Sequence, residues 1–256
     1  MMSGRTGSRR SGAVARGTAV LELPQVTLIG VDCLDMERLL RAAEICQRSI
    51  RFGAVRLLSS IPHHHPSVVP IEPIGSREAY SSFMVKRVNS YVDTPFALVI
   101  QYDGFVLNPD AWQDEFLNYD YIGAPWFEPE YGGALVGNGG FSLRSKRLLE
   151  ILQNDDSIAD PTDLDPPDAP EDWYICVMIR EYLEGKGIRF APAKLAQRFS
   201  LEGGEPFGVT WTNQFGFHGL RWTDISPWLR EHPEAAPRID NTLDEETRAL
   251  RARLGT

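Results

Sequence analysis

A carboxylate at the end of the most apolar run is the first candidate for chemistry. The run Phe96–Ile100 continues directly into Gln101-Tyr102-Asp103-Gly104. Mg²⁺ and Mn²⁺ prefer oxygen ligands, and such a cation commonly bridges one or two carboxylates and the phosphates of a substrate. An aspartate at a strand tip is well placed for this, although it can also simply cap the following turn. Both interpretations stand at this point.

Two later segments carry further candidates. Asn138, Gly139 and Gly140 form a glycine turn, where the missing side chains let a ligand approach the backbone amides. Glu171 and Asp172 stand at the start of an apolar segment. A carboxylate there suits a general base that takes a proton from an acceptor hydroxyl. Acidic residues in a first helical turn also simply complement the helix dipole, so this pair has a structural alternative.

The histidines divide into one candidate and one run that we set aside. His218 lies between Phe217 and Gly219, and such a residue either packs in a core or offers a ring nitrogen as a metal ligand. Residues 63–65 are three consecutive histidines in a proline-rich stretch. They have no cysteine or spaced carboxylate partner, so we assign them no metal.

Apolar runs and helical spacing indicate which elements must position these side chains. The expected strands are residues 25–31, 54–58, 96–102, 119–125 and 188–191, and the expected helices are 35–50, 76–91, 109–117, 145–153 and 171–183. Near-continuously apolar strands that alternate with helices predict an α/β fold with a mainly parallel central sheet covered on both faces. Ligands of such sheets bind at the carboxyl ends of the strands, where Asp32 and Asp103 lie.

Composition limits the class of protein. A chain of 256 residues suits one large α/β domain, here expected at residues 21–230. Residues 1–20 carry four arginines and no acid, and we predict that they form a disordered basic tail. Residues 231–256 are predicted to form a helical or frayed tail. The net charge of the whole chain is −9, so the rest of the chain carries −13 and would repel nucleic acid. No run approaches the length of a transmembrane segment, and three cysteines without a Cys-x-x-Cys pair favour a reducing cytoplasm.

Taken together and in this order, the motifs resemble those of the GT-A class of nucleotide-sugar glycosyltransferases. The likeness is strongest to an uncharacterised, mainly bacterial glycosyltransferase-like family. The strings that carry it are QYDGFVLNP, YDYIGAPW, VGNGGFSLRS, EDWYIC, FAPAKLAQRFSLE and FGFHG, spread over about residues 24–222. The resemblance implies a GT-A fold, in which a Rossmann-like first half binds the nucleotide and the second half binds the acceptor.

The resemblance also implies a metal site. Asp103 matches the last acid of the Asp-X-Asp element that holds the metal and the diphosphate, and His218 matches a late metal-binding histidine. The implied cofactor is a divalent cation, Mn²⁺ or Mg²⁺. Gln101 replaces the first acid of the element, a departure that bears on metal affinity and metal dependence.

Except for Lys86, the remaining roles are also implied by the resemblance to GT-A glycosyltransferases. Asp172 is expected to be the base, with Glu171 beside it. The other residues expected to contact the donor are Asp32 at the nucleoside, Lys86 near phosphate on charge and position alone, and Asn138, Gly139 and Gly140 at the sugar.

The sequence therefore predicts a metal-assisted, inverting glycosyltransferase. It would move a sugar from a nucleotide-diphosphate sugar, such as a UDP-sugar, to a hydroxyl of a glycan or glycolipid, in the cytoplasm or at the inner face of the membrane. A nucleotidyltransferase is disfavoured, because residues 30–34 (GVDCL) lack a glycine-rich, basic loop. A catalytically silent nucleotide-sugar-binding module stays open, because of Gln101.

Overall fold

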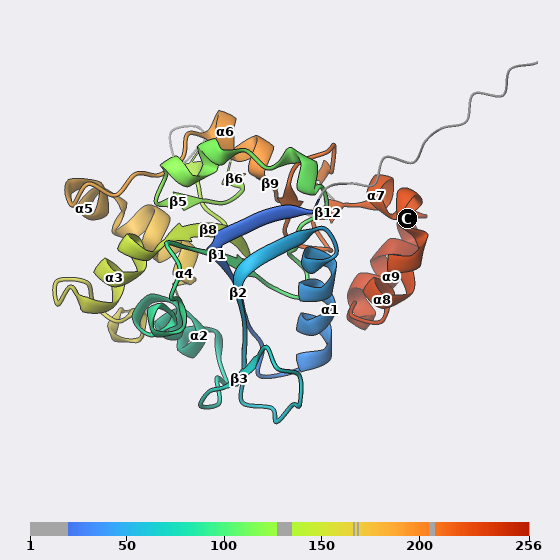
Figure 1. Ribbon diagram of the computed structural model, residues 1–256. Helices are drawn as coiled ribbons and strands as arrows, with labels where there is room; N and C mark the ends of the chain where they lie inside the picture. The colour runs from blue at the N-terminus through green and yellow to red at the C-terminus, as the bar shows by residue number, and fades with distance from the viewer. Residues whose placement is uncertain (1–19, 127–134, 166, 168, 205–207, 256) are drawn as a thin grey trace, which may run out of the picture.

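Six strands form the central sheet, in the order β3-β2-β1-β4-β8-β5 (Figure 1). The computed structural model describes residues 20–126, 135–165, 167, 169–204 and 208–255. The strands are β1 (Leu21–Val31), β2 (Ile50–Ser59), β3 (Val68–Pro70), β4 (Phe96–Ile100), β5 (Tyr121–Ile122) and β8 (Phe141–Ser145). Strands β3, β2, β1 and β4 pair in parallel, and β8 runs antiparallel to both β4 and β5. The predicted α/β class with a mixed, mainly parallel sheet is confirmed.

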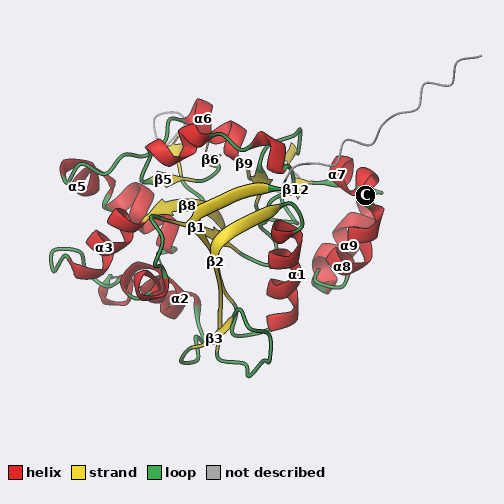
Figure 2. Cartoon of the chain, viewed as in Figure 1, coloured by secondary structure: helices red, strands yellow, loops and turns green. Residues whose placement is uncertain are grey.

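Helices cover both faces of this sheet, which explains why its strands are apolar without alternation (Figure 2). The main covering helices are α1 (Met36–Gln47), α2 (Arg77–Lys86) and α3 (Lys146–Asn154). Leu28 of β1 packs in the same buried cluster as Leu39 of α1. The next residue, Ile29, points to the opposite face and packs with Met84 of α2 and Leu149 of α3.

The helix starts follow the predicted capping residues, and some helix lengths differ. Asp35, Ser76 and Ser145 each accept a backbone N–H from the first turn of the helix that follows them. The helix expected to reach residue 91 ends at Lys86, where the backbone leaves the helical conformation. A 3₁₀ turn over Val88–Tyr91 follows, and it buries Val88 with the α2 face of the sheet.

Three other elements depart from the sequence expectation. Residues 109–117 form two 3₁₀ turns, Pro109–Ala111 and Asp114–Asn118. The expected helix 171–183 is divided into α4 (Glu171–Trp173), a π-helical turn (Tyr174–Met178) and α5 (Arg180–Gly185). The expected strand 188–191 contributes only a bridge between Phe190 and Tyr121.

Short strand pairs complete the second half. They are β6 (Pro125–Trp126) with β7 (Leu135–Val136), β9 (Ser200–Leu201) with β11 (Gly216–Phe217), and β10 (Val209–Thr210) with β12 (Thr223–Asp224). Helix α6 (Ala193–Phe199) leads into β9. After Trp228 the chain is largely helical and packs on the body, because Ile239 and Leu243 are buried with Trp228 in the main cluster. Its helices are α7 (Ser226–Glu231), α8 (Ala236–Asp240) and α9 (Glu245–Leu254), beside α1 in Figure 1.

Several ends of the strands meet at one edge of the sheet. Gly30 pairs with Ile100, so that Asp32 and Asp103 follow neighbouring strands at the same edge. Because β8 is antiparallel, its first residue, Phe141, pairs with the last residue of β4. The turn at residues 138–140, which precedes β8, therefore lies at the same edge of the sheet as Asp103, which follows β4.

The predicted basic tail, residues 1–20, falls almost entirely outside the described residues. Among the residues that are described, no helix has both the length and the apolar character needed to cross a membrane.

Candidate functional site

Two short parallel strands place His218 beside Asp103. In the β9–β11 pair, Phe217 lies opposite Leu201, and the His218 N–H donates to the Leu201 carbonyl at 2.9 Å. Gly219, the next residue, donates its N–H to the Asp103 carbonyl at 2.8 Å. The end of β11 therefore lies directly against the loop that follows β4.

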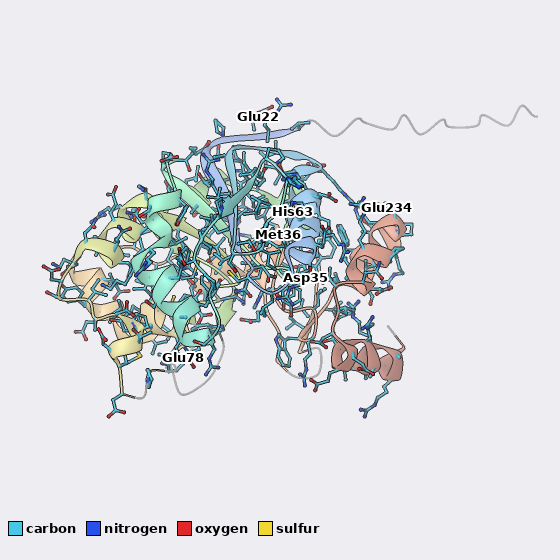
Figure 3. The ribbon with its side chains drawn as sticks, turned by 90° about the horizontal axis from the view of Figure 1, so that it is seen from below. Glu22, Asp35, Met36, His63, Glu78 and Glu234 are labelled. Carbon is cyan, nitrogen blue, oxygen red and sulfur yellow. The ribbon has the colours of Figure 1, made fainter. Side chains whose placement is uncertain are left out.

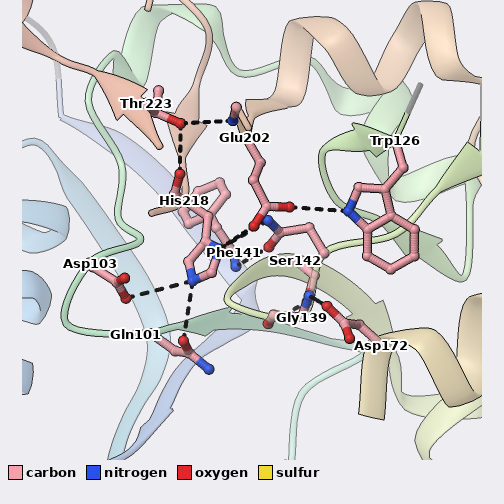
Figure 4. Close-up of polar contacts among 12 residues, drawn as sticks. Gln101, Asp103, Trp126, Gly139, Phe141, Ser142, Asp172, Glu202, His218 and Thr223 are labelled. Atoms are coloured by element: carbon pink, nitrogen blue, oxygen red, sulfur yellow. Dashed lines mark hydrogen bonds and ion pairs between the residues drawn. The ribbon is translucent and has the colours of Figure 1, made fainter. Parts of the chain in front are cut away.

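The His218 ring bridges groups from both halves of the chain (Figure 4). Its Nε2 atom lies 3.6 Å from Asp103 Oδ1 and 3.2 Å from Gln101 Oε1. Its Nδ1 atom lies 2.9 Å from Glu202 Oε1, at the end of the neighbouring strand β9. The two predicted metal ligands, separated by more than a hundred residues in sequence, therefore meet.

The electrostatics of this group are those of a cation between two carboxylates. Burial by itself lowers the pKa of His218, but the neighbouring Asp103 and Glu202 outweigh it and hold that pKa well above 6.5. Burial raises the pKa of Glu202, yet donors from His218, Trp126 and Asn138 bring it below its usual value. These contacts therefore favour the protonated imidazole of His218 and the ionised carboxylate of Glu202 when no cation is bound.

The residues present fit a divalent cation. Asp103 Oδ1 is buried, has no hydrogen-bond partner and lies 3.6 Å from His218 Nε2, so a cation could bind between these two atoms. The carboxylate of Asp103, the amide oxygen of Gln101 and the imidazole of His218 make a donor set that suits Mn²⁺ or Mg²⁺. No cluster of three or more His, Cys, Asp or Glu that could hold a metal occurs in the described parts of the chain. A cation here would depend on Gln101 and on substrate phosphates to complete its shell.

The glycine turn leaves no room for side chains. Asn138 has a φ of 66°, and its carbonyl accepts the Tyr121 hydroxyl at 2.9 Å. A Cβ atom on Gly139 would lie 1.9 Å from Glu171 Oε1. A Cβ atom on Gly140 would lie 2.0 Å from His218 Nε2, the atom that faces Asp103. The turn therefore packs directly against the candidate cation site.

Gly140→Ala is expected to displace the His218 ring and weaken Mn²⁺ binding by at least about tenfold, because metal sites tolerate little displacement of a ligand. Isothermal titration with Mn²⁺ measures this. Gly185→Ala is the matched control, since nothing lies within 4 Å of a Cβ added there. Unchanged Mn²⁺ affinity in Gly140→Ala would contradict the placement of the cation at His218.

Asp172 lies on the other side of this turn. Its Oδ2 accepts the Gly139 N–H at 2.8 Å, and its Oδ1 accepts the Trp173 N–H at 2.8 Å. Burial and the neighbouring Glu171 raise the pKa of Asp172 to about 6, against these two hydrogen bonds. A carboxylate with this pKa is ionised at neutral pH and still basic enough to accept a proton.

Glu171 has a supporting position instead. Its Oε1 accepts a hydrogen bond from Arg144 Nη2 at 3.0 Å, and the two side chains of this ion pair are almost completely buried. Arg144 also donates to the Gly139 carbonyl at 3.3 Å and, through Nε, to Ser142 at 3.0 Å. The expectation that Glu171 acts as a reacting group is not supported, because this ion pair commits its carboxylate to holding the turn.

Asp32 borders a hollow at the same edge. Its carboxylate accepts the N–H groups of Leu34 and Asp35 and pairs with Arg38 Nε at 2.6 Å. Arg38 in turn lies over the Tyr102 ring, 4.0 Å from its centroid. These side chains, with Tyr80 and Gln101, line a hollow of about 410 Å³ next to the candidate cation site.

Two sets of sequence candidates lie elsewhere. The Lys86 ammonium donates to the carbonyls of Leu152 at 3.0 Å and Ile158 at 2.5 Å, at the far end of α2 from the hollow. The structure thus does not bring Lys86 to the donor side. His63 Nε2 contacts Glu37 at 3.2 Å near the start of α1 (Figure 3).

Sequence reasoning missed Glu202, Arg144 and the polar contact of Trp126. Trp126 Nε1 donates to Glu202 Oε2 at 3.1 Å. The available signals were an arginine inside the short segment 141–145 (FSLRS), and two similar segments, FSLE and FGFH, that end in Glu202 and His218.

Comparisons with known proteins give one family and two distant structural likenesses. The galactosyltransferase LgtC, solved in complex with donor and acceptor sugar analogues, has a TM-score of 0.43 at 13% identity, over 88% of this chain and 99% of that one. A197 from STIV has a TM-score of 0.36 at 13% identity, over 65% of this chain and 80% of that one. No curated protein matches the chain in sequence.

The family model covers more than half of the chain and includes most of the site, from before α2 to His218. Residues 66–218 match it, and the chain thus belongs to the family described as "Protein of unknown function (DUF5672)".

Proposed function

We propose that this chain transfers a sugar from a nucleotide-diphosphate sugar to a hydroxyl group of a glycan or glycolipid, with inversion at the anomeric carbon. One observation supports this most. The turn Gly139–Gly140 contacts a candidate cation site on one side, at His218 and Asp103, and a carboxylate of raised pKa on the other, at Asp172. Glycosyl transfer needs these two groups close together, one for the leaving diphosphate and one for the acceptor.

The hollow beside Asp32 is the proposed nucleoside site. It opens at the carboxyl edge of the sheet, where ligands of α/β folds bind, and its volume suits a nucleotide. Asp32 is already engaged by Arg38 and two backbone N–H groups, so it shapes the wall of the hollow and holds Arg38 over Tyr102. A nucleoside here would direct its diphosphate toward Gln101 and Asp103.

The proposed chemistry uses the chain's own groups as follows. Asp103 and His218, with Gln101, would hold a divalent cation, which when bound supplies positive charge to the leaving diphosphate. Asp172 takes the proton of the acceptor hydroxyl as its oxygen attacks the anomeric carbon. The new carbon–oxygen bond forms while the bond from that carbon to the diphosphate breaks. The products are the glycosylated acceptor and a nucleoside diphosphate.

A catalytically silent nucleotide-sugar-binding module is the second candidate, and one observation favours it. His218 lies between Asp103 and Glu202 and also contacts Gln101, so the group is electrostatically satisfied without a metal. A panel of nucleotide sugars, tested with and without Mn²⁺ by thermal unfolding and then for nucleoside diphosphate release, separates the two functions. Binding without release would favour the silent module. Pyrophosphate release from a nucleoside triphosphate and a sugar phosphate would instead show a nucleotidyltransferase.

Asp103→Ala is expected to remove the Mn²⁺-dependent part of the thermal stabilisation by a nucleotide sugar. A ligand present at about 100 times its Kd adds about 2.7 kcal/mol to the free energy of unfolding, so the loss is easily measured. Asp93→Ala is the matched control, because the Asp93 side chain is 82% exposed and precedes β4, at the opposite end of that strand from Asp103. Equal Mn²⁺-dependent stabilisation in Asp103→Ala and the wild type would refute the assignment of Asp103 as a ligand.

A further inference from the structure

Among the residues that the structure describes, Glu202 is the carboxylate in contact with His218 that neither the cation site nor the proposed base uses. Its side chain is only 20% exposed, and it follows Leu201 at the end of β9. The parallel register of β9 and β11 makes its position equivalent to that of His218 on the next strand. Two residues at equivalent positions of adjacent strands point the same way, which explains their contact.

The two oxygens of Glu202 serve different partners. Oε1 lies 2.9 Å from His218 Nδ1, and Oε2 accepts Trp126 Nε1–H at 3.1 Å. The indole nitrogen is a donor only, so it fixes which oxygen is left for the histidine. Asn138 adds to this arrangement, because its Oδ1 accepts the Phe141 N–H at 3.0 Å, which turns its Nδ2 toward the contact. Nδ2 lies 3.1 Å from His218 Nδ1 and donates to the Glu202 carboxylate.

In addition to the β9–β11 pairing, the hydroxyl of Thr223 links the backbone on both sides of this contact. Thr223 Oγ1 donates to the His218 carbonyl at 2.8 Å and accepts the Gly203 N–H at 3.2 Å (Figure 4). The backbone segments that carry Glu202 and His218 are therefore linked without any contribution from the Glu202 and His218 side chains. A carboxylate that a separate donor and a fixed backbone hold in place is suited to orienting its partner.

We propose that Glu202 is a positioning residue, which orients the His218 ring for cation binding, and that Trp126 fixes the orientation of Glu202. The Nδ1–H of His218 donates to Glu202, so that Nε2 carries the lone pair that faces Asp103 and Gln101. A carboxylate on the outer nitrogen of a metal-binding histidine fixes the tautomer and makes the ring a stronger ligand. This inference rests on the cation site of the proposed function.

Glu202→Gln tests the idea because a glutamine has one acceptor atom where the glutamate has two. If the amide oxygen stays with Trp126 Nε1–H, the amide NH₂ faces His218 and requires a lone pair on Nδ1, which moves the ring proton to Nε2. If the oxygen turns to His218 instead, the NH₂ opposes the indole N–H. Adding Trp126→Phe removes that second conflict, so the double variant lets the amide oxygen return to His218.

The expected results concern Mn²⁺ affinity and the position of the ring proton. Glu202→Gln should weaken Mn²⁺ binding, measured by titration calorimetry, by about 10–100-fold. Glu202→Gln/Trp126→Phe should recover most of that loss. Trp126→Phe alone removes the donor that orients Glu202 but keeps the carboxylate at His218, so it should weaken Mn²⁺ binding, by less than Glu202→Gln does. Nitrogen-15 spectra of the histidine rings, recorded without metal at a pH where His218 has lost one proton, should show Nδ1–H in the wild type and a shift toward Nε2–H in Glu202→Gln.

Glu115→Gln is the matched control, because the Glu115 side chain is 53% exposed and pairs with Arg198 at 3.5 Å on the surface. Wild-type Mn²⁺ affinity in Glu202→Gln, or no recovery in the double variant, would overturn the proposal. If the wild type transfers no sugar but the variants change Mn²⁺ affinity as described, the proposed function fails and the role of Glu202 stands. If the wild type binds no Mn²⁺, the cation site fails, and an unchanged ring tautomer in Glu202→Gln then overturns the role of Glu202 as well.

Discussion

Asp172→Asn is expected to lower the rate of sugar transfer by roughly 10²–10⁴-fold, the usual contribution of a general base, and to leave donor binding intact. The amide retains an oxygen for the Gly139 N–H, so the turn keeps its shape, but it cannot accept the acceptor's proton. Transfer rate and donor affinity are measured separately, the first by nucleoside diphosphate release and the second by titration calorimetry. Near-normal transfer in Asp172→Asn would exclude Asp172 as the base.

The same substitution should raise the free energy of unfolding, by an amount that depends on pH. Burial raises the pKa of Asp172 to about 6 from 3.8, so its ionisation destabilises the folded state. This group contributes stability at low pH that is lost as the pH rises through about 6. Asp172→Asn has no charge to bury, so we expect its free energy of unfolding to exceed that of the wild type by about 3 kcal/mol at pH 8 and to differ little from it at pH 4. Urea unfolding at the two pH values measures this, with the exposed Asp163→Asn as control.

The pH profile of transfer follows from the same pKa. Only ionised Asp172 accepts a proton, so the rate should rise through about pH 6 and level off above it. At one pH unit below that pKa, about a tenth of the plateau rate should remain. A rate independent of pH between 5 and 8 would contradict the assignment.

Arg144→Met is expected to have the largest effect on folding. The substitution leaves the Glu171 carboxylate buried without its partner, and breaking a buried pair from one side costs about 3–5 kcal/mol. The Gly139 carbonyl and Ser142 also lose a donor. Urea unfolding at pH 7 measures the loss in the free energy of unfolding.

Two further variants make this prediction specific. Arg144→Met/Glu171→Leu removes both charges and should recover most of the lost stability, because paired apolar replacements of buried ions are often neutral. Arg198→Ala breaks an exposed pair with Glu115 and should cost less than about 1 kcal/mol. If Arg144→Met also lost less than about 1 kcal/mol, the ion pair would not be what holds the glycine turn.

The sheet could be predicted because local patterns determine it. The apolar strands at 25–31, 54–58 and 96–102 correspond to β1, β2 and β4, and the cap residues Asp35, Ser76 and Ser145 mark the starts of three helices. Burial on both faces leaves a strong signal in sequence. The meeting of Asp103 with His218 did not follow from local pattern, since it depends on the pairing of two-residue strands.

The departures have physical reasons as well. Phe190 forms only a bridge, since its neighbour Tyr121 belongs to a two-residue strand at the sheet edge. The helix after Glu171 contains a π turn, a feature often found beside functional sites and one that helical periodicity does not distinguish. Lys86 was assigned from charge and position alone, and its partners are carbonyls from a distant part of the chain. The contact of Glu202 with His218 could not be predicted from the sequence, because it depends on the register of β9 and β11.

The proposed function depends most on a cation shared by Asp103 and His218 in the presence of a nucleoside diphosphate. A crystal of the chain grown with UDP and MnCl₂, measured for anomalous scattering from manganese, tests this most directly. We expect one peak within coordination distance of Asp103 Oδ1, His218 Nε2 and a phosphate oxygen. Manganese bound elsewhere, or UDP bound without manganese at these two side chains, would contradict it.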